Sequence, residues 1–259
     1  MDRGRIKTTL LLLLLTVNLV FLGIIVTDRV EAARLESEAR TALTEALARM
    51  GIAVAYGAIP REEAQPRYFI GRDVDAEREV ATALLGEPEA RDEGGGIYHY
   101  QSPLGQAQFR GGTFWLAFQG QSYSVLETGA LVERMGLTDN AGTGDDVYRT
   151  YSLRIEGRRV QNGQVTFHFA DGYVRELGGS ALWGARQGYA AGPQQDVATA
   201  LIILAGYLRE IDTVSRFERV EMGYYLLEGP GYLELRPVWL VETDVGIFSV
   251  DRQSGEVRR

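Results

Sequence analysis

The chain contains two histidines, the residues best suited to metal binding or proton transfer. Each is flanked by aromatic residues, in Tyr98-His99-Tyr100 and in Phe167-His168-Phe169. Both segments have the pattern of a β-strand, in which successive side chains point to opposite faces. If the aromatic neighbours face the core, both histidines face solvent. A metal site would also require carboxylates from distant segments, and the sequence marks none. We therefore expect no metal site.

Other polar motifs are weaker. The loop 139–146 is rich in aspartate and glycine. It lacks the alternating ligands and final glutamate of an EF-hand, so a solvated linker is favoured over a Ca²⁺ site. Gly94-Gly95-Gly96 does not open a helix after a strand, as phosphate-binding loops do. We expect it to provide slack between a helix and a strand. Ser180 lacks the Gly-x-Ser-x-Gly pattern of serine hydrolases.

These observations predict no catalytic residues, no cofactor and no metal, and hence a protein that is not an enzyme. One alternative stays open, an exported hydrolase with an unmarked pair of carboxylates among the 35 acidic residues. The net charge of −8 argues against nucleic acid as a partner. The absence of cysteine excludes disulfides and thiolate chemistry.

The N-terminal segment favours a membrane anchor. Residues 8–27 carry no charge and include six consecutive leucines at 10–15. About 20 residues at roughly 1.5 Å each match the thickness of a bilayer core. Basic residues precede the segment and acidic ones follow it, which predicts a cytoplasmic tail at 1–7 and an extracellular C-terminal domain. The expected localisation is the plasma membrane, with a single pass and lipid contact. The alternative is a signal peptide cleaved after Ala32.

Three small or polar residues of this segment are candidates for contacts between membrane spans: Thr16, Asn18 and Gly23. An amide in hydrocarbon gains from a hydrogen bond to a neighbouring helix. The alternative is that Asn18 bonds to the backbone of its own helix.

Downstream, the periodicities predict helices at 28–50, 75–85, 126–137 and 194–211. Asp75 is the expected N-cap of the second helix. Strands are expected at 52–59, 67–71, 97–101, 106–109, 113–118, 148–155, 165–170, 173–177, 216–222, 224–227, 232–241 and 247–251. The juxtamembrane helix 28–50 either packs on its own domain or pairs with a membrane partner.

A helix followed by antiparallel strands recurs after residue 125, which predicts an α+β fold. We expect an N-terminal α+β part at 51–125, followed at 126–259 by two α+β units, 126–190 and 191–259. The predicted fold class is thus an N-terminal transmembrane helix followed by an extracytoplasmic domain of repeated helix-plus-antiparallel-sheet units.

The C-terminal residues carry a resemblance to known families. Pro237-Val238-Trp239 opens one strand, and a second strand ends in Asp251-x-x-Ser254-Gly255-Glu256-Val257. The alternating apolar residues predict a hairpin followed by a tight turn at Gly255, and we expect Trp239 to cap the core. The pattern resembles the PepSY type. The residues 1–8, the leucine-rich segment through 18–22 and the strand between Gly51-Ile52 and Ile59-Pro60 resemble YycI proteins.

The resemblance implies a YycH/YycI-like outer domain and a regulatory function without catalysis. The implied partners are the sensor histidine kinase of a cell-wall two-component system in Gram-positive bacteria and a YycH-like companion protein. The protein would modulate the kinase by binding through its membrane helix and outer domain. The alternative is a PepSY-like inhibitor or chaperone of an exported protease.

Overall fold

The computed structural model divides the chain into two compact units, Met1–Val54 and Ala55–Arg259, which we describe separately. The residues described are 37–55, 57–120, 123–134, 143–180, 182–209, 215–229 and 231–259, with Asn18, Leu22, Thr27, Glu31, Arg34 and Leu35.

In the first unit, residues 37–49 form a continuous helix. It ends as predicted at Gly51, whose φ of +83° is a conformation that glycine adopts readily. The amide of Ile52 returns to the carbonyl oxygen of Leu47 at 3.0 Å and closes the last turn. The strand β1 that follows spans only Ala53–Val54, shorter than expected.

The membrane prediction requires correction. Within the described part of the chain, no helix is both long and apolar enough to cross a bilayer. Residues 37–49 include the charged residues Glu38, Arg40, Glu45 and Arg49, and such a helix cannot serve as an apolar span. The expected localisation as a single-pass membrane protein is therefore not supported. Of the predicted anchor 8–27, only Asn18, Leu22 and Thr27 are described.

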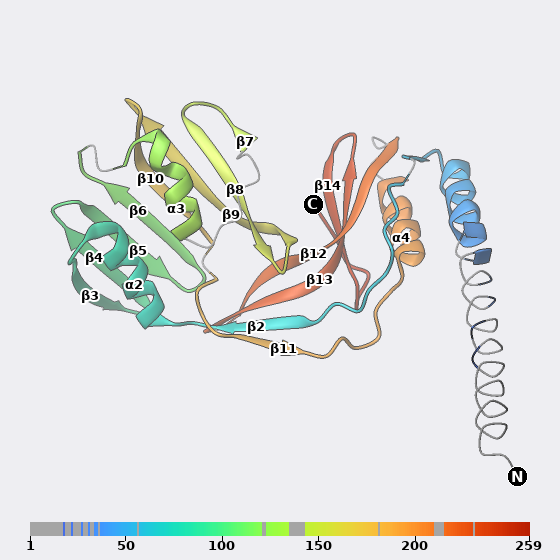
Figure 1. Cartoon of the computed structure of the whole chain (residues 1–259), viewed down its shortest axis with the longest axis horizontal. Coiled ribbons are helices and arrows are strands. Elements are labelled where there is room, and N and C mark those ends of the chain that lie inside the picture. Colours follow the sequence, from blue (N-terminus) through green and yellow to red (C-terminus); the bar gives the residue numbers. More distant parts are fainter. Residues whose placement is uncertain are drawn as a thin grey trace, which may run out of the picture. The chain divides into compact units, whose positions relative to one another are not determined.

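The second unit consists mainly of β-strands (Figure 1). Its elements are β2 (Arg67–Gly71), α2 (Val74–Leu85), β3 (Glu89–Gly94), β4 (Ile97–Ser102), β5 (Gly105–Arg110), β6 (Thr113–Phe118), η1 (Val125–Glu127), α3 (Thr128–Arg134), β7 (Thr143–Gly144), β8 (Tyr148–Ile155), β9 (Arg158–Ala170), β10 (Tyr173–Ser180), β11 (Arg186–Tyr189), α4 (Val197–Arg209), β12 (Arg216–Gly229), β13 (Tyr232–Thr243), β14 (Gly246–Asp251) and β15 (Val257–Arg258).

The predicted fold class is wrong. The strands of the second unit join one mixed sheet with the path β11-β2-β13-β12-β9-β10-β6-β5-β4-β3, and β14, β15, β7 and β8 are attached at its sides. The expected repeat of helix plus antiparallel sheet is not seen. The strands expected in separate units belong to one sheet, because β9, β12 and β13 are longer than predicted. As a result, β12 pairs with β13 on one side and with β9 on the other.

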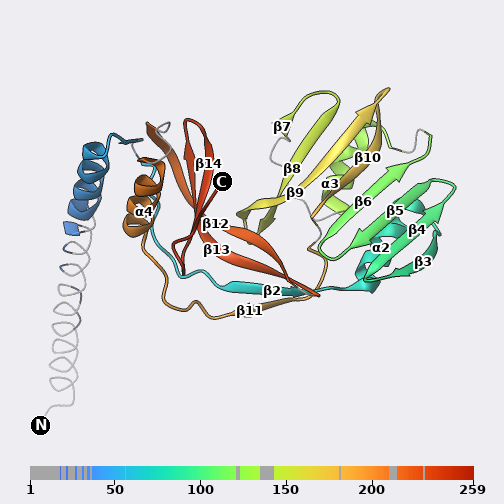
Figure 2. The ribbon, with the colours of Figure 1, turned by 180° about the vertical axis from the view of Figure 1, so that it is seen from behind.

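We name two parts of this sheet. The central lobe comprises β3–β10 with α2 and α3, and the C-terminal lobe comprises β2 and β11–β15 with α4. Both views show β2 leading to the beginning of α2, while β11 lies beside it and leads back toward α4 (Figure 2). The buried hydrophobic cluster is continuous between the lobes, from Leu84 and Phe109 in the central lobe to Tyr224 and Leu235 in the C-terminal lobe.

Local sequence explains the helix that connects β2 to the central lobe. Asp73 caps α2 by accepting a hydrogen bond from the amide of Ala76 at 3.0 Å. The N-cap is thus two residues earlier than predicted. The helix buries Ala81, Leu84 and Leu85 against the sheet, and it ends at Gly86, which has a φ of +77°.

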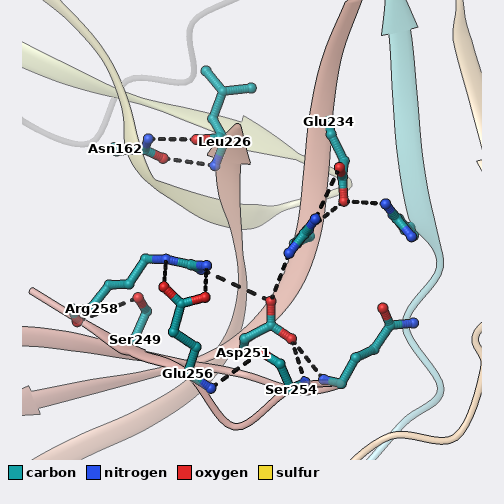
Figure 3. Close-up of polar contacts among 11 residues, drawn as sticks. Asn162, Leu226, Glu234, Ser249, Asp251, Ser254, Glu256 and Arg258 are labelled. Atoms are coloured by element: carbon teal, nitrogen blue, oxygen red, sulfur yellow. Dashed lines mark hydrogen bonds and ion pairs between the residues drawn. The ribbon is translucent and has the colours of Figure 1, made fainter. Parts of the chain in front are cut away.

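The joint between β9 and β12 has little backbone pairing. Their backbones pair in parallel only at Val160 and Tyr224. Two residues further, the Asn162 amide takes the place of a backbone pair (Figure 3). Its Nδ2 donates to the carbonyl oxygen of Leu226, and its Oδ1 accepts from the Leu226 amide, both at 2.7 Å. One side chain therefore extends the pairing between the two lobes.

Replacing Asn162 by alanine is expected to lower the free energy of unfolding by about 1–3 kcal/mol, since two hydrogen bonds are lost. The amide of Leu226 should also exchange with solvent faster. Urea unfolding and hydrogen exchange measure the two effects. Gln164→Ala, on an exposed position of the same strand, is the control and should change neither. Unchanged exchange at Leu226 in the Asn162 variant would contradict the assigned joint.

Candidate functional site

The C-terminal motif forms the predicted hairpin and turn. Asp251 lies at the end of β14, 2% exposed. Its Oδ1 accepts from the amides of Gln253 and Ser254 at 2.8 and 3.0 Å (Figure 3). Gly255 has a φ of +76°, which explains the glycine at that position. Trp239, expected to cap the core, is fully buried within it. The motif therefore stabilises the C-terminal lobe.

A network of buried carboxylates and arginines supports the same lobe. Glu234 on β13 lies 2.7 Å from Arg67 of β2 and 2.5 Å from Arg236. Arg236 in turn lies 3.9 Å from Asp251. Burial alone would raise the pKa of Glu234, but the hydrogen bonds from Arg236 and Arg67 lower it below its ordinary value of 4.5. The network ties β2, β13 and β14 together.

A cavity of about 520 Å³ lies where the two lobes meet. This volume is within the range of ligand-binding pockets, roughly 300–1,000 Å³. We call it the junction pocket. It is formed by the end of β2, the beginning of α2, the turns β3–β4, β5–β6 and β12–β13, and the segment before β11. Its lining residues are Ile70, Gly71, Arg72, Asp73, Glu77, Gly95, Gly96, Arg110, Gly111, Gly112, Thr113, Trp183, Gly184, Glu228, Gly229, Gly231, Tyr232 and Leu233.

Glycines shape the walls of the junction pocket. A Cβ atom on Gly112 would collide with the side chain of Leu233, and one on Gly184 would collide with the carbonyl oxygen of Gly71. The first contact places the β5–β6 turn of the central lobe against β13, and the second places the segment before β11 against the end of β2. Gly95 and Gly96 have φ values of +62° and +77° and form the tight turn between β3 and β4. The segment predicted to provide slack is thus a hairpin turn.

Arg72 fixes one wall of the pocket. Its Nε and Nη2 donate to the Glu77 carboxylate, both at 2.8 Å, and its Nη1 donates to the carbonyl oxygen of Gly96. The hydrogen bonds with Glu77 raise the pKa of Arg72 above its ordinary value. Because these groups satisfy one another, Arg72 and Glu77 hold the β3–β4 turn to α2.

Two charged residues of the pocket have no such partner. Arg110 ends β5 in the central lobe, and Glu228 lies near the end of β12 in the C-terminal lobe; both are exposed. Within the described residues, neither has an oppositely charged group within 4.0 Å. The pocket therefore presents one positive and one negative group to an occupant, each from a different lobe.

A second contact between the lobes lies at Tyr68 of β2. Its hydroxyl donates to Glu156 Oε1, in the β8–β9 turn, at 2.5 Å. This hydrogen bond, followed by burial, raises the pKa of Tyr68 to about 12. Arg158, two residues beyond Glu156, forms an ion pair of 2.9 Å with Glu63. The β8–β9 turn is thus held to the segment that contains β2.

The Tyr68 contact predicts a stability loss in alkali. The pKa of Tyr68 rises from 10 to about 12, so the folded state holds the hydroxyl proton more tightly than the unfolded state does. The hydrogen bond to Glu156 therefore stabilises the fold fully below pH 10, and this stabilisation is lost between pH 10 and pH 12. Tyr68→Phe should be less stable than the wild type by about 1 kcal/mol at neutral pH. Thermal unfolding measured against pH should show this difference disappear between pH 10 and pH 12. Tyr207→Phe, on the exposed face of α4, is the control. A difference that persists at pH 12 would contradict the hydrogen bond.

The structure places the residues considered from sequence at separate positions. His168 lies on β9, half-buried and stacked on Tyr148 at 4.7 Å between ring centroids, while His99 lies half-buried on β4. Ser180 ends β10. Of the three candidates for contacts between membrane spans, Thr16 and Gly23 lie outside the described residues, and Asn18 is helical and exposed.

Only part of the loop 139–146 is described. Asp145 accepts hydrogen bonds from the amides of Val147 and Tyr148, both at 2.8 Å. The bond from Tyr148, followed by that from Val147, lowers the pKa of Asp145. The carboxylate thus caps a turn. Within the described ranges, no cluster of three or more histidine, aspartate or glutamate residues could hold a metal ion.

Sequence reasoning missed the junction pocket and its charged residues, Arg110 and Glu228. A local signal existed in the glycines at 95–96, 111–112, 229 and 231, which mark the hairpin turns. Nothing in the sequence showed that these turns meet at one place. Fold and site together define a mixed β-sheet protein with a ligand-sized pocket between two lobes.

No family model matches the chain, and no curated protein matches it. Among solved structures, it is similar to an uncharacterized protein from Eubacterium rectale ATCC 33656. The match has 11% sequence identity and a TM-score of 0.45, and it covers 80% of this chain and 89% of the other. A similarity of this size supports no statement about function.

Proposed function

We propose that this protein is a non-catalytic binding protein that regulates a sensor histidine kinase of a cell-wall two-component system, together with a YycH-like companion. The class of partner rests on the resemblance of the sequence to YycI proteins. The manner of action rests on one observation, the junction pocket lined by both lobes.

The pocket suits a regulator because its occupant would contact both lobes. Arg110 and Gly111 belong to the central lobe, whereas Glu228 and Tyr232 belong to the C-terminal lobe. The backbones of β9 and β12 pair at one position, beside the Asn162 amide, and a buried hydrophobic cluster runs on between the lobes. A partner that binds one arrangement better than another shifts the equilibrium between them. A partner with equal affinity for both arrangements would leave the equilibrium unchanged.

A photo-crosslinking residue at position 232 tests the proposal. Tyr232 is 39% exposed at the pocket, and Tyr207 on α4 is 42% exposed and serves as the matched control. The full-length chain carrying the crosslinker is mixed with the purified kinase. We expect crosslinking from position 232 and not from position 207, together with altered kinase autophosphorylation in the presence of the unmodified chain.

Three outcomes would overturn the proposal. The first is an absence of crosslinking from position 232, and the second is equal crosslinking from both positions. The third is kinase autophosphorylation that is the same with and without the chain. Specific inhibition of a protease by the chain would instead favour the PepSY-like inhibitor.

A further inference from the structure

The charges of the junction pocket restrict its ligand. Of its five charged residues, Arg72 and Glu77 neutralise each other, and Asp73 caps α2. Arg110 and Glu228 remain for an occupant. A ligand with a single charge would pair with only one of these groups. A ligand that carries both charges satisfies the two together.

The acidic residues disfavour polyanions. Three carboxylates, those of Asp73, Glu77 and Glu228, line the pocket against two guanidinium groups. Two of the three lie at the beginning of α2, where they already occupy the favourable field of the helix N-terminus. A phosphate or polyphosphate group would therefore meet net repulsion, whereas a single carboxylate could pair with Arg110.

Apolar side chains form the rest of the pocket. Ile70 and Leu233 are 2% and 6% exposed. Trp183 lies half-buried against Phe109 and Phe114, with ring centroids at 5.5 and 5.0 Å. Because Ile70 and Leu233 are buried behind the wall, the apolar surface open to a ligand side chain comes from Trp183 and from Tyr232, which is 39% exposed. The exposed glycine turns provide backbone groups that can bond to a peptide unit.

We propose that the junction pocket binds a zwitterionic peptide of two or three residues with an apolar side chain. Its carboxylate pairs with Arg110, its ammonium group pairs with Glu228, and its side chain packs on Trp183 and Tyr232. This assignment deepens the proposed function by naming the ligand of the junction pocket. It rests on that pocket being the site through which the kinase is regulated. Binding of both ends draws the two lobes into one arrangement.

Peptides with blocked ends test the assignment. The probes are Ala-Leu and Ala-Ala-Leu, each as the free peptide, the N-acetylated peptide and the C-terminal amide. Isothermal titration of the full chain should show saturable binding of at least one free peptide. Blocking either end should weaken it about tenfold, the effect of losing one hydrogen-bonded charge pair of about 1.4 kcal/mol.

Variants of Arg110 and Glu228 identify which end of the peptide each of these residues binds. In Arg110→Gln, the free peptide and the amide should bind equally, while acetylation should still weaken binding. In Glu228→Gln, the free and acetylated peptides should bind equally, while amidation should still weaken binding. The controls are Arg91→Gln on β3 and Glu218→Gln on β12, both exposed and outside the pocket lining, and they should behave like the wild type. Thermal unfolding verifies that each variant is folded.

The proposal is overturned if none of the free peptides binds the wild type, or if blocked peptides bind as well as free ones. It is also overturned if both variants keep the full dependence on free ends. Such a result, with crosslinking of the kinase from position 232 intact, would remove the peptide ligand and leave the proposed function. Peptide binding without any effect on kinase autophosphorylation would leave the peptide ligand and overturn the proposed function.

Discussion

Trp239→Ala is expected to lower the free energy of unfolding by about 3–5 kcal/mol, the range for removing a large aromatic side chain from a core. The indole is fully buried on β13. Its Nε1 donates to the carbonyl oxygen of Gln195 at 3.2 Å, and the Arg252 guanidinium lies 4.5 Å from its ring. The alanine variant leaves a cavity and removes both contacts. Chemical denaturation with a fluorescence or circular dichroism readout measures the change.

Trp115→Ala is the matched control for this prediction. Trp115 lies on β6 and is 36% exposed, so its removal should cost about 1 kcal/mol. Equal losses in the two variants would contradict a core role for Trp239. Trp239→Phe should fall between the wild type and the alanine variant, because most of the volume is kept while the hydrogen bond is lost.

Glu234→Gln should lower the free energy of unfolding by about 3 kcal/mol at neutral pH, because it removes a buried partner of two arginines. The Glu234 side chain is 6% exposed, whereas those of Arg67 and Arg236 are 31% and 32% exposed. Since the arginines keep some access to water, we expect the lower end of the range for broken buried pairs.

The loss in Glu234→Gln should depend on pH. Glu234 has a pKa below 4.5 in the folded protein, so its stabilisation is present above pH 4.5 and is lost as the pH falls through the folded value. The difference between wild type and variant should therefore be constant at neutral pH and shrink in acid. Thermal unfolding over an acidic pH series measures it.

Glu242→Gln is the matched control for Glu234. Glu242 pairs with Arg219 at 3.2 Å, but the two side chains are 40% and 57% exposed. Exposed ion pairs contribute little, so this variant should lose less than about 1 kcal/mol. A Glu234 variant as stable as the Glu242 variant would show that the network does not stabilise the lobe.

Local patterns predicted many elements correctly. The alternation of 113–118 matches β6, where Phe114, Leu116 and Phe118 are buried. The helix ending at Gly86 was predicted for the same reason that it forms, since glycine and proline stop a helix. The turn at Gly255 was likewise anticipated from the need for a positive φ. These features depend on neighbours within a few residues.

Other strands lacked such a local pattern. All six residues of β3 are exposed, and so are the four residues of β11. With neither face buried, hydrophobic alternation is absent, and each of these strands forms because it pairs with a neighbour. Burial by distant parts of the chain likewise made β12 one strand where the sequence suggested two.

The joint and the pocket depended on contacts far apart in sequence. Asn162 meets Leu226 across 64 residues, and Gly112 abuts Leu233. A single sequence fixes which segments tend to be strands, helices or turns, because those preferences act through neighbouring residues. Which strand ends meet depends on how the whole sheet buries its apolar faces. The positions of Arg110 and Glu228 in one pocket therefore emerge only when the two lobes are packed together.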